Sequence, residues 1–128
     1  QILPTDLFPK AKHVITEIGR VNSASKALQA KDLSLFGNLL KESHRSLSED
    51  YEVSCVELDF LAQQSWKLPE VLGARMMGGG FGGCTINLLS TAFLENFQTE
   101  IYAAYKKQFD IEADFIPVSL SEGARILN

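Results

Sequence analysis

A run of glycine residues constrains the fold of this chain more than any other feature. Positions 78–83 are Gly-Gly-Gly-Phe-Gly-Gly, so five of the chain's nine glycines fall within six positions, with Phe81 among them. Glycine has no Cβ and tolerates positive φ, which lets backbone amides approach a ligand or another backbone closely. The run predicts a phosphate-approach loop, with a hairpin that merely turns a corner as the alternative.

The flanks of this loop exclude three familiar phosphate motifs. The dinucleotide fingerprint formally matches positions 78–83, but that motif opens a helix, whereas residues 84–89 alternate apolar and polar and predict a strand. A P-loop ends in Gly-Lys-Ser/Thr, and here Cys84 follows the last glycine. A protein-kinase loop needs a lysine on the next strand, and no basic residue appears before Lys106.

Hydrophobic periodicity predicts four helices and three strands in the order α-α-α-β-β-α-β. The expected helices span about 9–30, 32–47, 54–67 and a segment that starts at Ser90 or Thr91 and turns Leu94, Phe97, Ile101 and Tyr105 inward. The expected strands are 74–77, 84–89 and 113–118.

Particular side chains define these helices. Val14, Ile18, Val21 and Leu28 recur at helical spacing and predict an amphipathic first helix. Asp32 is expected to cap the second helix, whose Leu35, Phe36, Leu39, Leu40 and Leu47 line one face. Ser54-Cys55-Val56-Glu57 has the pattern of a capping box for the third.

This order predicts an α+β fold, a ferredoxin-like sandwich in which an antiparallel sheet is packed by helices. A length of 128 residues, 45% of them apolar, suits a single domain over 1–128. No linker rich in Pro, Gly or Ser divides the chain.

Composition narrows the function classes. No apolar run approaches the roughly 20 residues of a membrane span, and no leader precedes the first helix, so we expect a cytoplasmic protein without a membrane partner. The net charge is −4 and Lys and Arg are scattered, which argues against nucleic acid as a partner. Cys55 and Cys84 lack metal-ligand spacing, so we expect buried free thiols and no metal site.

The loop and its flanks closely resemble the third signature of the galactokinases, members of the galactose, homoserine, mevalonate and phosphomevalonate kinase superfamily. The resemblance covers four blocks in the family's order: 13–17 (His-Val-Ile-Thr-Glu), 36–47, 50–59 and 73–89. Two departures are Val56 and Met77, where the family is expected to have Pro and Thr. Met77 removes a hydroxyl beside the loop, which puts in doubt any hydrogen bond that this side chain makes in relatives.

The resemblance implies the C-terminal domain of such a kinase. That domain has a four-stranded antiparallel sheet, of which the fourth strand is absent here or lies near Ile2-Leu3. The family transfers the ATP γ-phosphoryl group to the anomeric O1 hydroxyl of α-D-galactose, with Mg²⁺ and an aspartate near the attacking oxygen. The sugar-gripping signature, the phosphate loop and the aspartate belong to the N-terminal domain and have no counterpart here. We therefore expect no catalytic residue in this chain, ATP and Mg²⁺ bound mainly by the N-terminal domain, and no activity of the chain alone. The start at Gln1 suggests a piece of a longer protein.

In the whole enzyme the loop would form one wall of the active-site cleft. The residues expected there are Gly78, Gly79, Gly80, Phe81, Gly82 and Gly83. By resemblance they approach the substrate and the partner domain's phosphate loop, where a Cβ at Gly79 or Gly80 would push backbones apart. Phe81 is expected to plug the domain interface in preference to touching the nucleotide.

Other polar residues have less specific patterns. Met77 and His44 are candidate cleft neighbours, although a helical His without a spaced carboxylate partner, such as His44 or His13, is more often solvated or capping. The carboxylates Asp50, Glu52, Glu57 and Asp59 lie where acidic residues complement a helix dipole.

Two other functions stay open. The chain would be a free-standing small-molecule-binding or interaction module if it bound a ligand without an N-terminal half. It would be a related sugar kinase if the absent sugar-contacting residues selected galactosamine, another hexose or arabinose. If a large interface is left open, we also expect an exposed apolar face.

Overall fold

The computed structural model describes residues 3–119, and within them the fold is α+β. Its elements are α1 (Phe8–Gln29), α2 (Leu33–Glu49), α3 (Val56–Trp66), β1 (Val71–Met76), β2 (Thr85–Leu89), the 3-10 turn η1 (Thr91–Phe93) and α4 (Leu94–Phe109). β1 and β2 pair antiparallel around the glycine loop, as the sequence predicts, and β1 begins earlier, at Val71.

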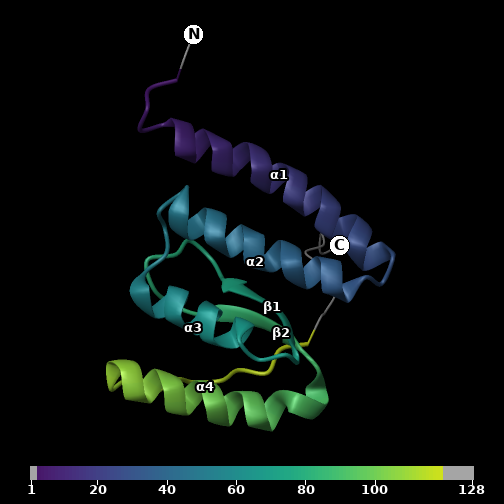
Figure 1. The fold of residues 1–128 in the computed structure, drawn as a ribbon, viewed down its shortest axis with the longest axis vertical. Helices are drawn as coiled ribbons and strands as arrows, with labels where there is room; N and C mark the ends of the chain where they lie inside the picture. The colour runs from purple at the N-terminus through teal and green to yellow at the C-terminus, as the bar shows by residue number, and fades with distance from the viewer. Residues whose placement is uncertain (1–2, 120–128) are drawn as a thin grey trace, which may run out of the picture.

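The helices lie in successive layers along the long axis of the molecule (Figure 1). α1 is outermost, α2 lies beneath it, the strands lie next to α3, and α4 runs along the opposite end. α2 and α3 both contact β1, whereas α1 contacts mainly α2. One long side of α1 therefore has no covering layer within the described residues.

The sheet is smaller than predicted. Residues 113–118 form no strand; only Ala113 and Phe115 of this segment are half-buried, and the Phe115 ring meets that of Phe97 edge-on at 6.2 Å. Ile116 and Val118 are 83% and 75% exposed. The alternating pattern thus reflects one aromatic anchor and not backbone pairing. Leu3 is in no strand, and Ile2 lies outside the described residues, so the described part has two strands and not the expected three or four.

The first helix forms as predicted, but its apolar stripe faces outward. Val14, Ile18, Val21 and Leu28 are 48%, 62%, 61% and 49% exposed. The buried residues of α1 are instead His13 and Ala27. Helical periodicity therefore found an apolar face that the described domain does not cover.

Two apolar clusters form the core, one including the last residue of β1 and the other its first. Leu47, Leu58 and Met76 make one, with Val53 and Cys55 against it. Val71, Phe97 and Ile101 make the other. The predicted inward residues Phe97, Ile101 and Tyr105 of α4 are buried, which confirms the orientation of that helix.

The helix starts confirm one predicted cap and contradict two. The Asp32 carboxylate accepts the Leu35 N–H at 2.9 Å, as expected. The capping box is wrong, because the Ser54 hydroxyl donates to the Asp59 carboxylate at 2.5 Å and α3 has no side-chain cap. The segment after Ser90 first forms η1, without a side-chain cap.

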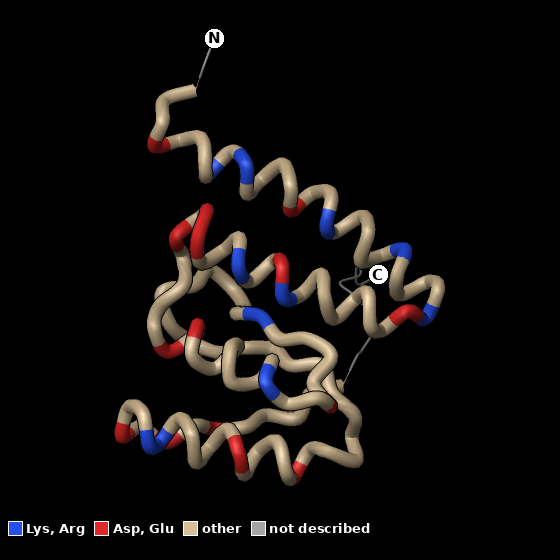
Figure 2. Tube along the Cα trace, in the orientation of Figure 1, with Lys and Arg blue, Asp and Glu red and all other residues tan. Residues whose placement is uncertain are grey.

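Lys and Arg are interspersed with Asp and Glu along the chain (Figure 2). Among residues 3–119, none of the helices has both the length and the apolar character that a membrane-spanning helix requires. Both cysteines are free thiols, but the expectation that they are buried is wrong: Cys84 is exposed, because it lies where the loop joins β2, and Cys55 is half-buried.

Candidate functional site

The glycine loop joins the two strands through several residues in the left-handed backbone conformation. The Met77 N–H donates to the Cys84 carbonyl at 3.0 Å and closes the hairpin below the loop. Positive φ angles follow at 77°, 86°, 134° and 99° for Gly78, Gly80, Gly82 and Gly83. Phe81 also has a positive φ, of 60°. Side chains with a Cβ rarely adopt these angles, which explains most of the glycines locally.

The loop is fastened to the chain's own backbone at Val53. The Phe81 N–H donates to the Val53 carbonyl at 2.7 Å. An ideal Cβ on Gly80 would lie 1.9 Å from the same oxygen. Gly80 thus approaches the segment between α2 and α3 of this chain closely, and the expected approach to another domain stays a prediction.

Gly79 is different from its neighbours. Its φ is not in the left-handed region, and a Cβ there would meet nothing within 4 Å among the described residues. Neither backbone conformation nor packing in the described part of the chain requires glycine at this position. The space beside Gly79 is open, as it is beside Gly78, Gly82 and Gly83.

The predicted cleft residues beside the glycines are exposed. The Phe81 side chain is 76% exposed and Met77 is 52% exposed. The covering of Phe81 by another domain therefore stays a prediction.

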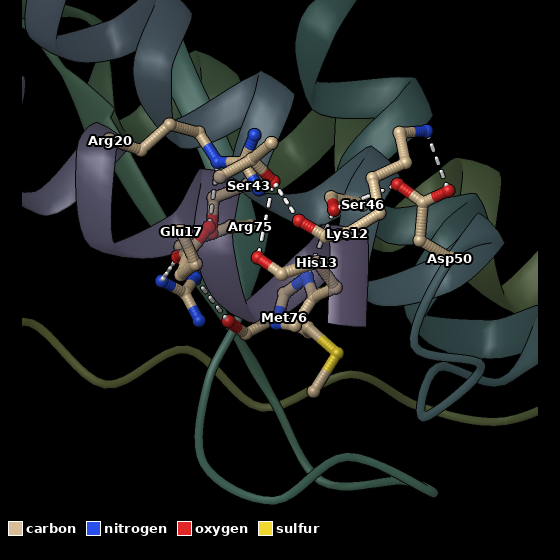
Figure 3. Close-up of polar contacts among 10 residues, drawn as sticks. Lys12, His13, Glu17, Arg20, Ser43, Ser46, Asp50, Arg75 and Met76 are labelled. Carbon is tan, nitrogen blue, oxygen red and sulfur yellow. Dashed lines mark hydrogen bonds and ion pairs between the residues drawn. The ribbon is translucent and has the colours of Figure 1, made fainter. Parts of the chain in front are cut away.

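Behind the loop, Glu17 joins three elements (Figure 3). Its carboxylate accepts from the Ser43 hydroxyl at 2.6 Å and from Arg20 Nε at 2.7 Å. Arg75 Nη1 of β1 lies 3.6 Å from it, and Arg75 Nε donates to the Met76 carbonyl. Burial acts to raise the pKa of Glu17, but the hydrogen bonds from Ser43 and Arg20 and the two arginine charges together hold it below its usual value.

His13 is part of the α1–α2 contact and is not solvated. Its Nδ1 lies 2.9 Å from the Ser46 hydroxyl, which itself donates to Asp50. Since that hydroxyl proton is used, Nδ1 donates to Ser46. The ring stacks on Tyr51 at 4.7 Å, and burial lowers the pKa of His13.

His44 lies in the interior of the described domain, 2% exposed, and its role as a cleft neighbour stays a prediction. Its Nδ1 accepts the Met76 N–H at 3.0 Å, and its Nε2 lies 3.2 Å from Asp59 Oδ1. The expectation of a solvated or capping histidine without a carboxylate partner is therefore wrong. Helical spacing missed the partner because Asp59 comes from α3, a different helix.

Asp59 accepts hydrogen bonds from two serine side chains, although its position in the sequence predicted only an interaction with the helix dipole. It accepts from the Ser54 hydroxyl at 2.5 Å and from the Ser48 hydroxyl at 2.8 Å. Burial lowers the pKa of His44, Asp59 acts to raise it, and the charge of Arg75 lowers it further, so the ring is neutral near pH 7.

The described residues offer no obvious place for a metal ion. Between residues 3 and 119 there is no group of three or more His, Cys, Asp and Glu side chains with the geometry to hold one. An open hollow of about 410 Å³ lies on α1, lined by His13, Val14, Glu17, Ile18, Val21, Asn22 and Tyr51.

Comparisons with known proteins agree with the architecture. Residues 24–107 match the family model described as "GHMP kinases C terminal". A galactokinase of Clostridium beijerinckii is 45% identical over 116 residues, which is 91% of this chain and 30% of that protein. The crystal structure of Lactococcus lactis galactokinase complexed with galactose superimposes with a TM-score of 0.83 at 40% identity, over 87% of this chain and 29% of that one. The L. major mevalonate kinase in complex with R-mevalonate gives a TM-score of 0.56 at 28% identity, over 70% of this chain and 26% of that one. The chain thus spans about 30% of the length of the curated relatives it matches.

Proposed function

This chain belongs to the GHMP kinase C-terminal family, and we propose that it is the C-terminal domain, residues 1–128, of a galactokinase. In that enzyme the γ-phosphoryl group of ATP is transferred to the anomeric O1 hydroxyl of α-D-galactose. The chain contributes one wall of the cleft and no catalytic residue, and it is inactive alone.

The observation that carries this proposal is the open position of Gly79 at the exposed tip of a fastened loop. The hydrogen bond from the Phe81 N–H to the Val53 carbonyl fixes the loop on the domain, so the outer side of the loop has a defined position. Beside Gly79 there is room for a substrate or a second backbone to approach. Such positioning supplies much of the rate enhancement in phosphoryl transfer.

The exposed face of α1 supports a larger protein around this domain. Val14, Ile15, Ile18 and Val21 expose between 48% and 70% of their surfaces on one helix. Contiguous apolar surface of this kind marks an interaction site. We propose that the N-terminal domain of the same polypeptide covers it, and that Phe81 is covered in the same assembly.

ATP and Mg²⁺ are assigned to the other domain. The described residues do not fit a Mg²⁺ site, since they bring no group of three or more ligating side chains together. No step of the transfer is therefore placed on a metal ligand of this chain. The loop and its supports act by positioning alone.

The test is a phosphoryl-transfer assay of the natural-length polypeptide with Gly79→Ala. A methyl group at Gly79 intrudes only on what approaches the loop from outside, so galactose 1-phosphate formation should fall about 10- to 100-fold. The thermal midpoint of the 128-residue chain should not change. Gly19→Ala is the matched control, because a Cβ there also meets nothing within 4 Å but lies on α1, away from the loop.

The outcomes separate the alternatives. Full activity of Gly79→Ala would contradict the cleft-wall role. Preferred phosphorylation of galactosamine or arabinose would identify a related sugar kinase. Binding of a small molecule or partner by the 128-residue chain, without sugar kinase activity of the natural-length protein, would favour a free-standing module.

A further inference from the structure

The edge of β1 that faces away from β2 carries a backbone N–H, that of Met76, which needs an acceptor just before the glycine loop. Backbone groups of an antiparallel pair point alternately toward and away from the partner strand. Met77 donates to Cys84 across the hairpin, so the N–H of Met76 points away from β2. Met76 is fully buried, so without an acceptor its N–H would be left unpaired at a cost.

Side chains from two helices solve this problem. The Trp66 indole N–H of α3 donates to the Ala74 carbonyl at 3.0 Å, and His44 Nδ1 of α2 accepts the Met76 N–H at 3.0 Å. The two rings meet edge-on, with centroids 5.5 Å apart. The last residue of β1 is thus tied to α2 through an imidazole nitrogen.

This bond dictates the tautomer of His44. A ring nitrogen that accepts a backbone N–H carries no proton, so the neutral ring has its proton on Nε2. That nitrogen is buried and faces Asp59 Oδ1 at 3.2 Å, although its N–H is not aligned for a hydrogen bond with any described residue. Protonation of Nδ1 would set two donors against each other at Met76.

The charged groups around the His44 ring shift its pKa in opposite directions. Asp59 from α3 favours the protonated ring, whereas Arg75 from β1 opposes it. On α2 itself, Arg45 lies over the Trp66 ring at 5.2 Å. Burial is the largest influence and keeps the pKa of His44 below its usual value, so the acceptor persists through neutral pH.

We infer that His44 is a positioning residue: as the Nε2–H tautomer, with Nε2 3.2 Å from Asp59, it holds the Met76 amide and thereby sets where the glycine loop leaves β1. Met77 and Gly78 follow directly, so a shift of Met76 is transmitted to the loop through two peptide units. The structural part of this inference stands by itself, and its effect on catalysis rests on the proposed function.

Two substitutions separate the two sides of the ring. His44→Asn places an amide oxygen near the position of Nδ1 and keeps an acceptor for Met76. His44→Gln reaches toward the position of Nε2 and leaves the Met76 N–H without an acceptor. Both lose the ring's contact with Trp66 and end in the same amide group, and they differ by one methylene group.

The first measurement is amide hydrogen exchange of Met76 in the 128-residue chain labelled with ¹⁵N-methionine. Exchange in His44→Asn should stay near that of the parent chain, and in His44→Gln it should be about tenfold faster or more, because a lost bond of about 1.4 kcal/mol changes an opening equilibrium tenfold. Equal exchange in the two variants would overturn the inference. If both variants fail to fold, the ¹⁵N spectrum of the His44 ring in the parent chain decides: a proton on Nε2 alone supports it, and a proton on Nδ1 overturns it.

The second measurement is the rate of galactose phosphorylation by the natural-length protein. The kcat of His44→Gln should lie about tenfold below that of His44→Asn, since displacement of a positioning group by a fraction of an ångström has effects of this size. Equal kcat values would overturn the link to catalysis. A parent protein that does not phosphorylate galactose would refute the proposed function, and the exchange experiment would still decide the role of His44.

Discussion

The backbones of Gly37 in α2 and Gly73 in β1 touch where the helix crosses the strand. An ideal Cβ on Gly73 would lie 2.3 Å from the Gly37 oxygen, and one on Gly37 would lie 2.3 Å from the Leu72 oxygen. His44 follows Gly37 by seven residues, about two helical turns, and so lies on the same face of α2. This close crossing is what lets an imidazole ring reach the amide of Met76.

A methyl group at this crossing should be costly. Gly37→Ala and Gly73→Ala should each lower the free energy of unfolding by about 1–3 kcal/mol or more, because the clash is with backbone and cannot be relieved by a side-chain rotation. Gly19→Ala should instead gain about 0.5–1 kcal/mol, since its Cβ is unobstructed and alanine favours the helix. Denaturant unfolding measures all three, and equal stabilities would contradict the contact.

The hydrogen bond that holds the loop at Val53 should depend on Gly80. Gly80→Ala places a Cβ against the Val53 carbonyl and demands a positive φ of 86°, so it should displace the Phe81 N–H from Val53. We expect faster amide exchange at Phe81 and a loss of about 1–3 kcal/mol in unfolding free energy. Gly79→Ala, which has room for its methyl group, should leave both unchanged; a loss as large in Gly79→Ala would contradict this assignment.

Stability should fall on mild acidification. Burial holds the pKa values of His13 and His44 below 6.5, so the unfolded chain takes up protons that the folded chain refuses. The folded state therefore has its full stability above pH 6.5 and loses up to about 1.4 kcal/mol per pH unit for each histidine below it. The pKa values of Glu17 and Asp50 are also lowered, but from 4.5 and 3.8, so the window from pH 6.5 to 5 belongs to the histidines.

Urea unfolding between pH 7.5 and 5 measures this slope. His44→Asn should reduce it by about half, because only His13 remains. A free energy of unfolding that rose on acidification would refute the buried neutral state of both rings.

Glu17 should stabilise the contact of α1 with α2 and β1. Glu17→Gln removes the charge that accepts from Ser43 and Arg20, so it should cost about 1–3 kcal/mol. Glu42→Gln is the matched control, because Glu42 is exposed on α2. Thermal unfolding of the two variants measures the difference, and no difference would show that the Glu17 network contributes nothing net.

The apolar face of α1 should matter only in the larger protein. Ile15→Ser and Ile18→Ser, at 70% and 62% exposure, should leave the stability of the 128-residue chain nearly unchanged and reduce its self-association. In the natural-length protein each should cost about 1.5–3 kcal/mol, since a buried isoleucine is lost. Ile116→Ser, at 83% exposure on a segment apart from α1, is the control. Equal effects in both forms would argue against an interdomain interface there.

Local sequence determined the elements that depend on neighbours in the chain. The helical spacing of apolar residues located α1 to α4, Asp32 capped α2 as expected, and the glycine run between two apolar segments gave an antiparallel hairpin. The superfamily motif followed from the same letters and is confirmed by the family match over residues 24–107. These features are encoded within a few residues of one another, so a pattern can reveal them.

Only the tertiary structure decided which faces are covered and which polar groups meet. The apolar stripe of α1 is exposed while His13 and His44 are buried, because burial depends on which element packs against a face. The Ser54 hydroxyl donates to Asp59 and forms no capping box. Phe115 packs its ring against Phe97, while the alternating segment around it forms no strand. The acceptor for Met76 comes from a residue 32 positions away. The periodic pattern of one segment carries no information about such distant partners, since their proximity arises only when helices cross a strand at contact distance.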